Sequence, residues 1–389
     1  MYDSIDFAQG STFAQCLYCF LLYCFLLLVS LKGNLTNTYT QDNYVFRKII
    51  LFGGILLFSL TSFVDADFFH YYESMYEYKN QVFVDTERGL EAFYQHLIYI
   101  INGNYFLFRL IVWGSSLLLI IFATRKFGAN VYRTLFVILA GYIMTFSYAR
   151  ASLAMAVFTT GAVIVSVVSE CETRKRIILT TLGLAIIACS IYFHRSMLPI
   201  LVASICWAFV PWKKQLTKYS LWLFPFFVFL CSVVLENVFE ELYVLANAIE
   251  DETGTLDKAE LYAEQESVTH NIRGYFRLFL HYSTFYIPFV LIANVFRSEE
   301  VVQSVNKRII WLYQIVYLII LIATSILFLD FGSRVFFYRF LYVSFIPMSI
   351  LITKMTDSGF LKKQQYRWIV AVFIISNLFQ LFAAVYSLR

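Results

Sequence analysis

Two carboxylates and one histidine are placed where they could act as general bases. Asp65 and Asp67 directly follow an apolar run, and Tyr71 and Tyr72 come shortly after them. A carboxylate at the end of a membrane span can take a proton or hold a cation, although it can also simply end the helix in water. His194 stands in a His-Arg-Ser turn between two apolar runs, where it could transfer a proton or merely close a hairpin. We predict Asp67 and His194 as candidate catalytic residues.

Arginines gather where the apolar runs would meet the outer face of a membrane. Arg150 and Arg195 lie in tight turns between two apolar runs, and Arg273, Arg277 and His281 are spaced to share one helix face. A guanidinium group binds phosphate and carboxylate oxygens through two parallel hydrogen bonds, whereas an arginine can also merely anchor a helix end. We predict that an anionic ligand binds at this face. The predicted binding residues are Arg150, Arg195, Arg273, Arg277, Arg334 and Arg339.

The two sides of the predicted membrane domain differ in the kind of basic residue that they carry, Lys or Arg. The inner loops contain eleven Lys and eight Arg, whereas the outer side contains two Lys and nine Arg. Interfacial anchoring would use lysine just as readily, so this bias supports an anion-binding role for the outer arginines. One of them, Arg109, lies inside an apolar run near its outer end, where it either joins this set or snorkels to the interface.

The elements that must hold these residues are membrane-spanning helices. The chain has 389 residues, of which 60% are hydrophobic and only 14% charged, whereas a soluble domain carries about 25% charged residues. The apolar runs are continuous, as in membrane helices. We predict an all-α polytopic membrane protein with about twelve transmembrane helices. The predicted spans are Phe13–Leu31, Ile49–Val64, Tyr105–Thr124, Thr134–Ser147, Ala151–Val168, Ile177–Phe193, Met197–Val210, Tyr219–Leu235, Phe276–Phe296, Ile309–Leu329, Val335–Thr353 and Trp368–Tyr386.

Basic residues set the predicted orientation of these spans. Each predicted inner loop contains three or four Lys or Arg, and the alternation holds along the whole chain, which puts both termini outside. Two outer segments are long, residues 65–104 and the acidic residues 236–275. Within the first, Glu87–Ile101 is typical of an amphipathic interfacial helix ended by Asn102-Gly103-Asn104. With no internal repeat and no soluble domain, we predict one integral membrane domain over residues 1–389.

Motifs for several other kinds of chemistry are absent from the sequence. It contains no Gly-rich phosphate loop, no His-Glu-x-x-His and no nucleophile elbow, and its five His are scattered. We therefore expect no metal, no cofactor and no nucleic-acid partner. No cleavable signal peptide is visible, and the Cys-x-x-Cys of Cys16 and Cys19 accompanies other apolar cysteines, which favours a packing role.

The sequence resembles the EpsG family of bacterial exopolysaccharide polymerases, which are relatives of Wzy-type O-antigen and capsule polymerases. The order of the features described above carries this resemblance. The resemblance runs over most of the chain and begins with Asp67 and the tyrosines after it, followed by an interfacial helix and a span. The sequence departs from the family at Ala151, where the family usually has Gln. The segments similar to the later family motifs are Arg150–Ala154, Phe193–Ser196 and Arg334–Arg339.

The resemblance implies a polymerase that joins polyprenyl-pyrophosphate-linked oligosaccharide repeat units at the outer face of the bacterial cytoplasmic membrane. A hydroxyl of one lipid-linked repeat would attack the anomeric carbon of another and expel polyprenyl pyrophosphate. Asp67 or His194 would accept the proton, the arginines would neutralise the leaving group, and Tyr71 and Tyr72 would contact the sugars. It also implies a relation to the GT-C glycosyltransferase architecture, with a chain-length regulator and a flippase as partners.

Two other functions fit some of the same residues. A flippase of lipid-linked oligosaccharides would need a charged cavity open to both faces, and the concentration of arginine on one face argues against it. Another polyprenyl-donor glycosyltransferase, a ligase or an acyltransferase would use the same arginines with a single donor. A ladder of repeats, rather than one added unit, would distinguish the polymerase from a ligase.

Overall fold

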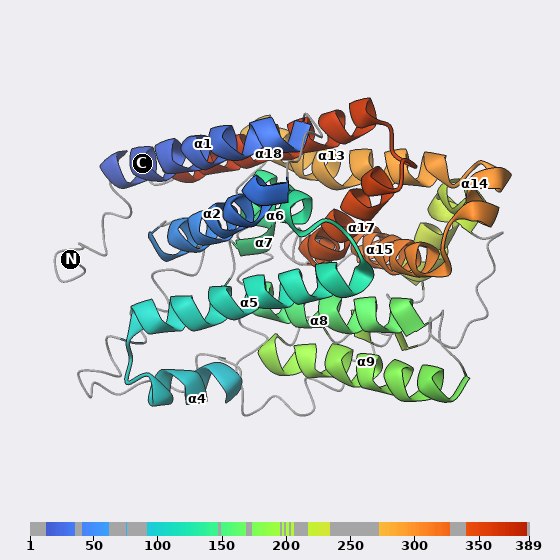
Figure 1. Ribbon diagram of the computed structural model, residues 1–389, viewed down its shortest axis with the longest axis horizontal. Helices are drawn as coiled ribbons and strands as arrows, with labels where there is room; N and C mark the ends of the chain where they lie inside the picture. The colour runs from blue at the N-terminus through green and yellow to red at the C-terminus, as the bar shows by residue number, and fades with distance from the viewer. Residues whose placement is uncertain are drawn as a thin grey trace. The chain divides into compact units, whose positions relative to one another are not determined.

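The computed structural model consists of helices and their connecting turns, and no strand occurs in the part of the chain that it describes. By their contacts the residues form two compact units. Unit 1 comprises Met1–Arg195 with Ser349–Arg389, and unit 2 comprises Ser196–Met348. Figure 1 shows the helices coloured along the chain. The described residues are 13–35, 41–61, 75, 92–146, 149–168, 173–194, 197, 200–201, 204–205, 217–233, 272–326 and 340–386.

Each unit is built from apolar helices. The helices of unit 1 are α1 (Phe13–Leu35), α2 (Gln41–Thr61), α4 (Ala92–Ile100), α5 (Tyr105–Phe127), α6 (Val131–Ala140), α7 (Tyr142–Phe146), α8 (Ala149–Val168), α9 (Thr173–Phe193), most of α17 (Phe345–Asp357) and α18 (Lys363–Tyr386). The described helices of unit 2 are a stretch over Thr217–Val233, α13 (Ile272–Val295), α14 (Glu299–Ser304), α15 (Lys307–Ile326) and the start of α17.

Several helices have the length and composition of a membrane span. Among the described residues these are Tyr105–Phe127, Ala151–Val168, Lys175–Phe193 and Lys307–Ile326, and each coincides with a predicted span. Shorter apolar helices at Leu17–Leu31, Val131–Ala140, Thr217–Val233 and Tyr282–Val295 also fall on predicted spans. An all-helical fold with helices suited to a membrane is therefore confirmed for these parts of the chain.

One predicted span differs from the structure. Thr134–Ser147 was expected to be a single helix, but it is two helices, α6 and α7, interrupted at Gly141. The break is stable inside an apolar core because its backbone groups have partners. The Tyr23 hydroxyl donates to the last carbonyl oxygen of α6 at 3.0 Å, and Asn377 Oδ1 accepts from the second amide of α7 at 2.8 Å.

Other predictions fall partly on residues that the structure does not describe. Val335–Thr353 is described only from residue 340 onward. In this part, a turn at Ser344 directly precedes α17. Met197–Val210 is described only at scattered positions, and residues 236–271 and most of 65–91 lie outside the described part.

Local sequence explains how α5 ends and α6 begins. Asn104 is the N-cap of α5, with its side chain accepting from Leu107 N at 3.1 Å. Gly128 ends α5 in the left-handed region (φ 73°), a conformation that glycine adopts without steric cost. Asn130 then caps α6 by accepting from Arg133 N at 3.1 Å. A turn of three residues thus reverses the chain between two helices.

Helices α8 and α9 form a closely packed pair in unit 1. The α8 span is 83% buried, whereas the α9 span is 17% buried, so α8 is central and α9 lies on the surface of the unit. The two helices run antiparallel and approach closely at their glycines. A Cβ atom added at Gly161 would lie 2.6 Å from the Gly183 carbonyl oxygen and 2.9 Å from the Ile187 amide nitrogen. Figure 1 shows α5, α8 and α9 side by side.

Aromatic rings form much of the core of unit 2. Phe289 of α13 stacks on Tyr313 of α15, with ring centroids 6.2 Å apart, and Phe224 packs against Phe289 at 5.5 Å. The Tyr313 hydroxyl shares a hydrogen bond of 2.7 Å with Ser220 Oγ. The helix over Thr217–Val233, α13 and α15 therefore pack as one cluster.

Candidate functional site

The structure describes some of the predicted site residues and leaves others outside. Arg150 is the second residue of α8, and Arg273 and Arg277 lie on the first turns of α13, with their backbones described. His194 directly follows α9 and has a half-buried side chain. The residues that lie outside the described part, and whose roles stay predictions, are Asp67, Tyr71, Tyr72, Arg195, Arg334 and Arg339.

Arg150 and His194 lie at the same end of the antiparallel pair α8 and α9. Gly161 and Gly183 mark the level where the two backbones meet. Arg150 precedes Gly161 by eleven residues, and His194 follows Gly183 by eleven residues. At 1.5 Å per residue, both positions are roughly 16 Å from the crossing along the helix axes, in the same direction. The packing of α8 on α9 therefore puts the two turns at one level, which we call the predicted outer end of unit 1.

Helix α4 packs against the same end of α9. The Phe93 ring lies 4.7 Å from the Phe193 ring and 6.1 Å from the Tyr192 ring, measured between centroids. Tyr94 contacts Phe108 of α5 at 6.0 Å. Figure 1 shows α4 beside the adjoining ends of α5 and α9. The residues predicted to form an interfacial helix thus pack on the last two residues of α9, directly before His194.

Arg109 is the most deeply buried cation at this end among the described residues. Its exposed fraction is 1%, so its side chain does not snorkel to the surface. Its Nη1 donates to the carbonyl oxygen of Leu60, in the last turn of α2, at 3.2 Å. The guanidinium carbon lies 4.4 Å from the Trp113 ring centroid and 5.4 Å from that of Tyr105. Of the two alternatives that the sequence left open for Arg109, the structure excludes snorkelling.

The family of the chain is decided by a comparison with known families. The model of the EpsG family matches residues 44–389, which is most of the sequence. The chain belongs to the EpsG family. This is a Wzy-type, polymerase-like family, so this EpsG-family chain is a membrane protein of polysaccharide biosynthesis. No curated protein and no solved structure matches the chain.

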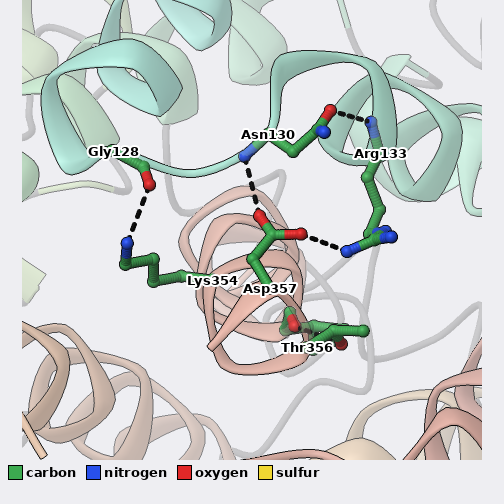
Figure 2. Close-up of polar contacts among 7 residues, drawn as sticks. Gly128, Asn130, Arg133, Lys354, Thr356 and Asp357 are labelled. Atoms are coloured by element: carbon green, nitrogen blue, oxygen red, sulfur yellow. Dashed lines mark hydrogen bonds and ion pairs between the residues drawn. The ribbon is translucent and has the colours of Figure 1, made fainter. Parts of the chain in front are cut away.

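The opposite end of unit 1 in this EpsG-family protein holds a second buried arginine. Arg133 forms an ion pair with Asp357, the last residue of α17, and its guanidinium lies 5.6 Å from the Tyr366 ring centroid. The other Asp357 oxygen accepts from Asn130 N at 3.0 Å, and Lys354 Nζ donates to Gly128 O at 2.9 Å. Figure 2 shows the contacts of Asp357 with Arg133 and Asn130, and that of Lys354 with Gly128. They tie the turn between α5 and α6 to the end of α17, which is a structural role.

Burial also affects how readily the Asp357 carboxylate binds a proton. It raises the pKa of Asp357 above its ordinary value, while Arg133, the Asn130 amide and Lys354 oppose the rise. Arg109 stands nineteen residues before Gly128, which is roughly 28 Å along α5, and Arg133 lies just beyond that end of α5, in the first turn of α6.

Among the described residues of this EpsG-family chain, no group of three or more His, Cys, Asp or Glu side chains could hold a metal ion. The surroundings of Arg109, in contrast, have a signal in the sequence. Its neighbours Tyr105 and Trp113 stand four residues before and four residues after it, a spacing that puts both rings on the arginine's face of a helix. That pattern could have indicated a guanidinium held by aromatic rings.

Proposed function

We propose that this protein polymerises polyprenyl-pyrophosphate-linked oligosaccharide repeat units at the outer face of the bacterial cytoplasmic membrane. The observation that carries the proposal is the common level of Arg150 and His194 at one end of the α8–α9 pair, in a chain of a polymerase-like family. A cation and a proton acceptor are the groups that glycosyl transfer from a pyrophosphate donor requires.

In the proposed reaction, a hydroxyl oxygen of the acceptor repeat attacks the anomeric carbon of the donor and forms the new glycosidic bond. The bond from that carbon to the pyrophosphate oxygen breaks, and its electron pair leaves with polyprenyl pyrophosphate. Asp67 or His194 accepts the hydroxyl proton. The proposed pyrophosphate-binding residues are Arg150, Arg195, Arg273, Arg277, Arg334 and Arg339, and the proposed sugar-binding residues are Tyr71 and Tyr72.

The proposal includes a complete membrane arrangement. We propose about twelve spans in one integral domain over residues 1–389, both termini outside, and a relation to the GT-C architecture. The outer segments 65–104 and 236–275 would then face the substrates. The packing of α4 on the end of α9 supports this, because it brings part of the first outer segment to the turn of His194. A chain-length regulator and a flippase are the proposed partners.

The test is replacement of single arginines by alanine. Arg150→Ala and Arg195→Ala should lower polymer yield about 10- to 1000-fold, because each removes positive charge from the developing pyrophosphate. Arg176→Ala is the matched control, since Arg176 is exposed at the other end of α9. Polymer length and yield are compared in membranes that contain equal amounts of each variant.

The products distinguish the alternatives. Unchanged polymer from Arg150→Ala would contradict the proposed role of this arginine. A single added unit in place of a ladder would identify a ligase, and unpolymerised repeats accumulating at the inner face after deletion would identify a flippase.

A further inference from the structure

The last turn of α2 is held by side chains from three other helices. Ser59 Oγ accepts from the Tyr142 hydroxyl of α7 at 2.8 Å, and the Leu60 carbonyl oxygen accepts from Arg109 of α5 at 3.2 Å. Thr61 Oγ1 accepts from the Tyr18 hydroxyl of α1 at 3.3 Å. The final carbonyls of a helix lack partners within it, and a cation is favoured at this end of the helix dipole. Three consecutive residues are thus fixed in place.

The arginine in this arrangement is itself held rigidly. The planar guanidinium lies between the rings of Trp113 and Tyr105, four residues away on either side of Arg109 in α5. Its Nη1 donates to the Leu60 carbonyl oxygen at 3.2 Å, so a charged, planar group from α5 is held against the last turn of α2.

Tyr142 is fixed by the break between α6 and α7. The Tyr23 hydroxyl donates to the carbonyl oxygen of Ala140, and Asn377 accepts from the amide of Ile143, so the backbone on both sides of Tyr142 is anchored. The Tyr142 ring also packs edge-on against Phe58 of α2, with centroids 4.5 Å apart. An unbroken helix would not offer α2 this hydroxyl in the same way.

We infer that Arg109 and Tyr142 are positioning residues that fix the end of α2, from which the sequence runs on to Asp67. The inference rests on the proposed function, in which Asp67 is a candidate base. Asp65 is the fourth residue after Thr61, so only a few residues separate the held turn from the acidic pair. Displacement of the base by about an ångström can lower the reaction rate about a hundredfold.

The experiment is steady-state kinetics of the full-length protein in liposomes with lipid-linked repeats as substrate. Arg109→Lys keeps the charge but loses the planar fork, so kcat should fall about 10- to 100-fold while KM stays within about twofold of the wild-type value. Tyr142→Phe removes a single oxygen and should lower kcat several-fold in the same way. If Arg109→Lys does not fold, the kcat of Tyr142→Phe tests the inference alone.

Arg133→Lys is the matched control, because Arg133 is also a buried arginine of unit 1 but lies at the other end, on Asp357. It should lower the unfolding temperature at least as much as Arg109→Lys does, with kcat within about twofold of wild type. The inference is overturned if kcat is unchanged in both Arg109→Lys and Tyr142→Phe, if KM rises instead, or if Arg133→Lys lowers kcat equally. Wild-type protein that makes no polymer would instead overturn the proposed function.

Discussion

The glycine at the crossing of α8 and α9 gives the sharpest mutational prediction. In Gly161→Ala, the new methyl group would lie 2.6 Å from the Gly183 carbonyl oxygen and 2.9 Å from the Ile187 amide nitrogen. Both contacts are with backbone, which cannot rotate away, so the helices must separate by about 0.8 Å to reach an ordinary contact of 3.4 Å. Because Arg150 and His194 lie on opposite helices of this pair, the separation also changes their spacing.

The magnitude follows from two opposing effects. Overpacking costs about 1–3 kcal/mol, and the better helix propensity of alanine returns up to about 1 kcal/mol, so we expect a net loss of about 1–2 kcal/mol in the free energy of unfolding. Displacement of the reacting groups by nearly an ångström should lower polymerisation by about 10- to 100-fold. The loss of polymerisation should therefore exceed what the modest loss in the free energy of unfolding would cause.

The assay compares Gly161→Ala with Gly114→Ala, in which the added methyl group on α5 meets no atom within 4 Å. The control should keep full activity and gain up to about 1 kcal/mol in stability. Unfolding is followed in detergent and polymer yield in liposomes. If Gly161→Ala matched the control in both measurements, the close packing of α8 on α9 and the register derived from it would be refuted.

Two further predictions concern the polar groups of unit 1. Asn377→Leu leaves the Ile143 amide at the helix break without its acceptor and should lower the free energy of unfolding by about 1–3 kcal/mol, measured by denaturation in mixed micelles. The raised pKa of Asp357 means that the folded state binds a proton more readily than the unfolded state. The stability of the wild-type protein relative to Asp357→Asn should therefore fall as pH rises through the range just above the ordinary pKa of aspartate, and a pH-independent difference would contradict this.

The spans could be predicted because their signals are local. The apolar runs that became α5, α8 and α9 contain enough consecutive hydrophobic residues for a helix. The Asn-Gly-Asn sequence was expected only to end the preceding helix, and the structure shows that its Asn104 also caps α5.

The break at Gly141 could not be predicted, since the sequence around it is as apolar as a continuous span. What stabilises the break comes from residues remote in the chain, Tyr23 and Asn377. The role of Arg109 was likewise undecided, because its burial depends on how α2 packs beside α5. Tertiary contacts, not local sequence, decide both features.

The common level of Arg150 and His194 was predicted only as a shared outer location. Their equal distance from the crossing depends on the glycines of α8 and α9, which have no special spacing within either helix. The resemblance to the EpsG family, by contrast, could be identified from short ordered motifs, and the family match over residues 44–389 confirms it.

The most direct test of the account is the binding of polyprenyl pyrophosphate and polyprenyl monophosphate to the purified protein, measured by the change in tryptophan fluorescence. Wild-type protein and Arg176→Ala should prefer the pyrophosphate, and Arg150→Ala should lose about 10- to 100-fold in affinity for it, as expected for a charge-assisted hydrogen bond. Equal binding of both lipids to the wild type, or pyrophosphate affinity unchanged by Arg150→Ala, would contradict the claim that this end of the membrane domain binds the leaving group.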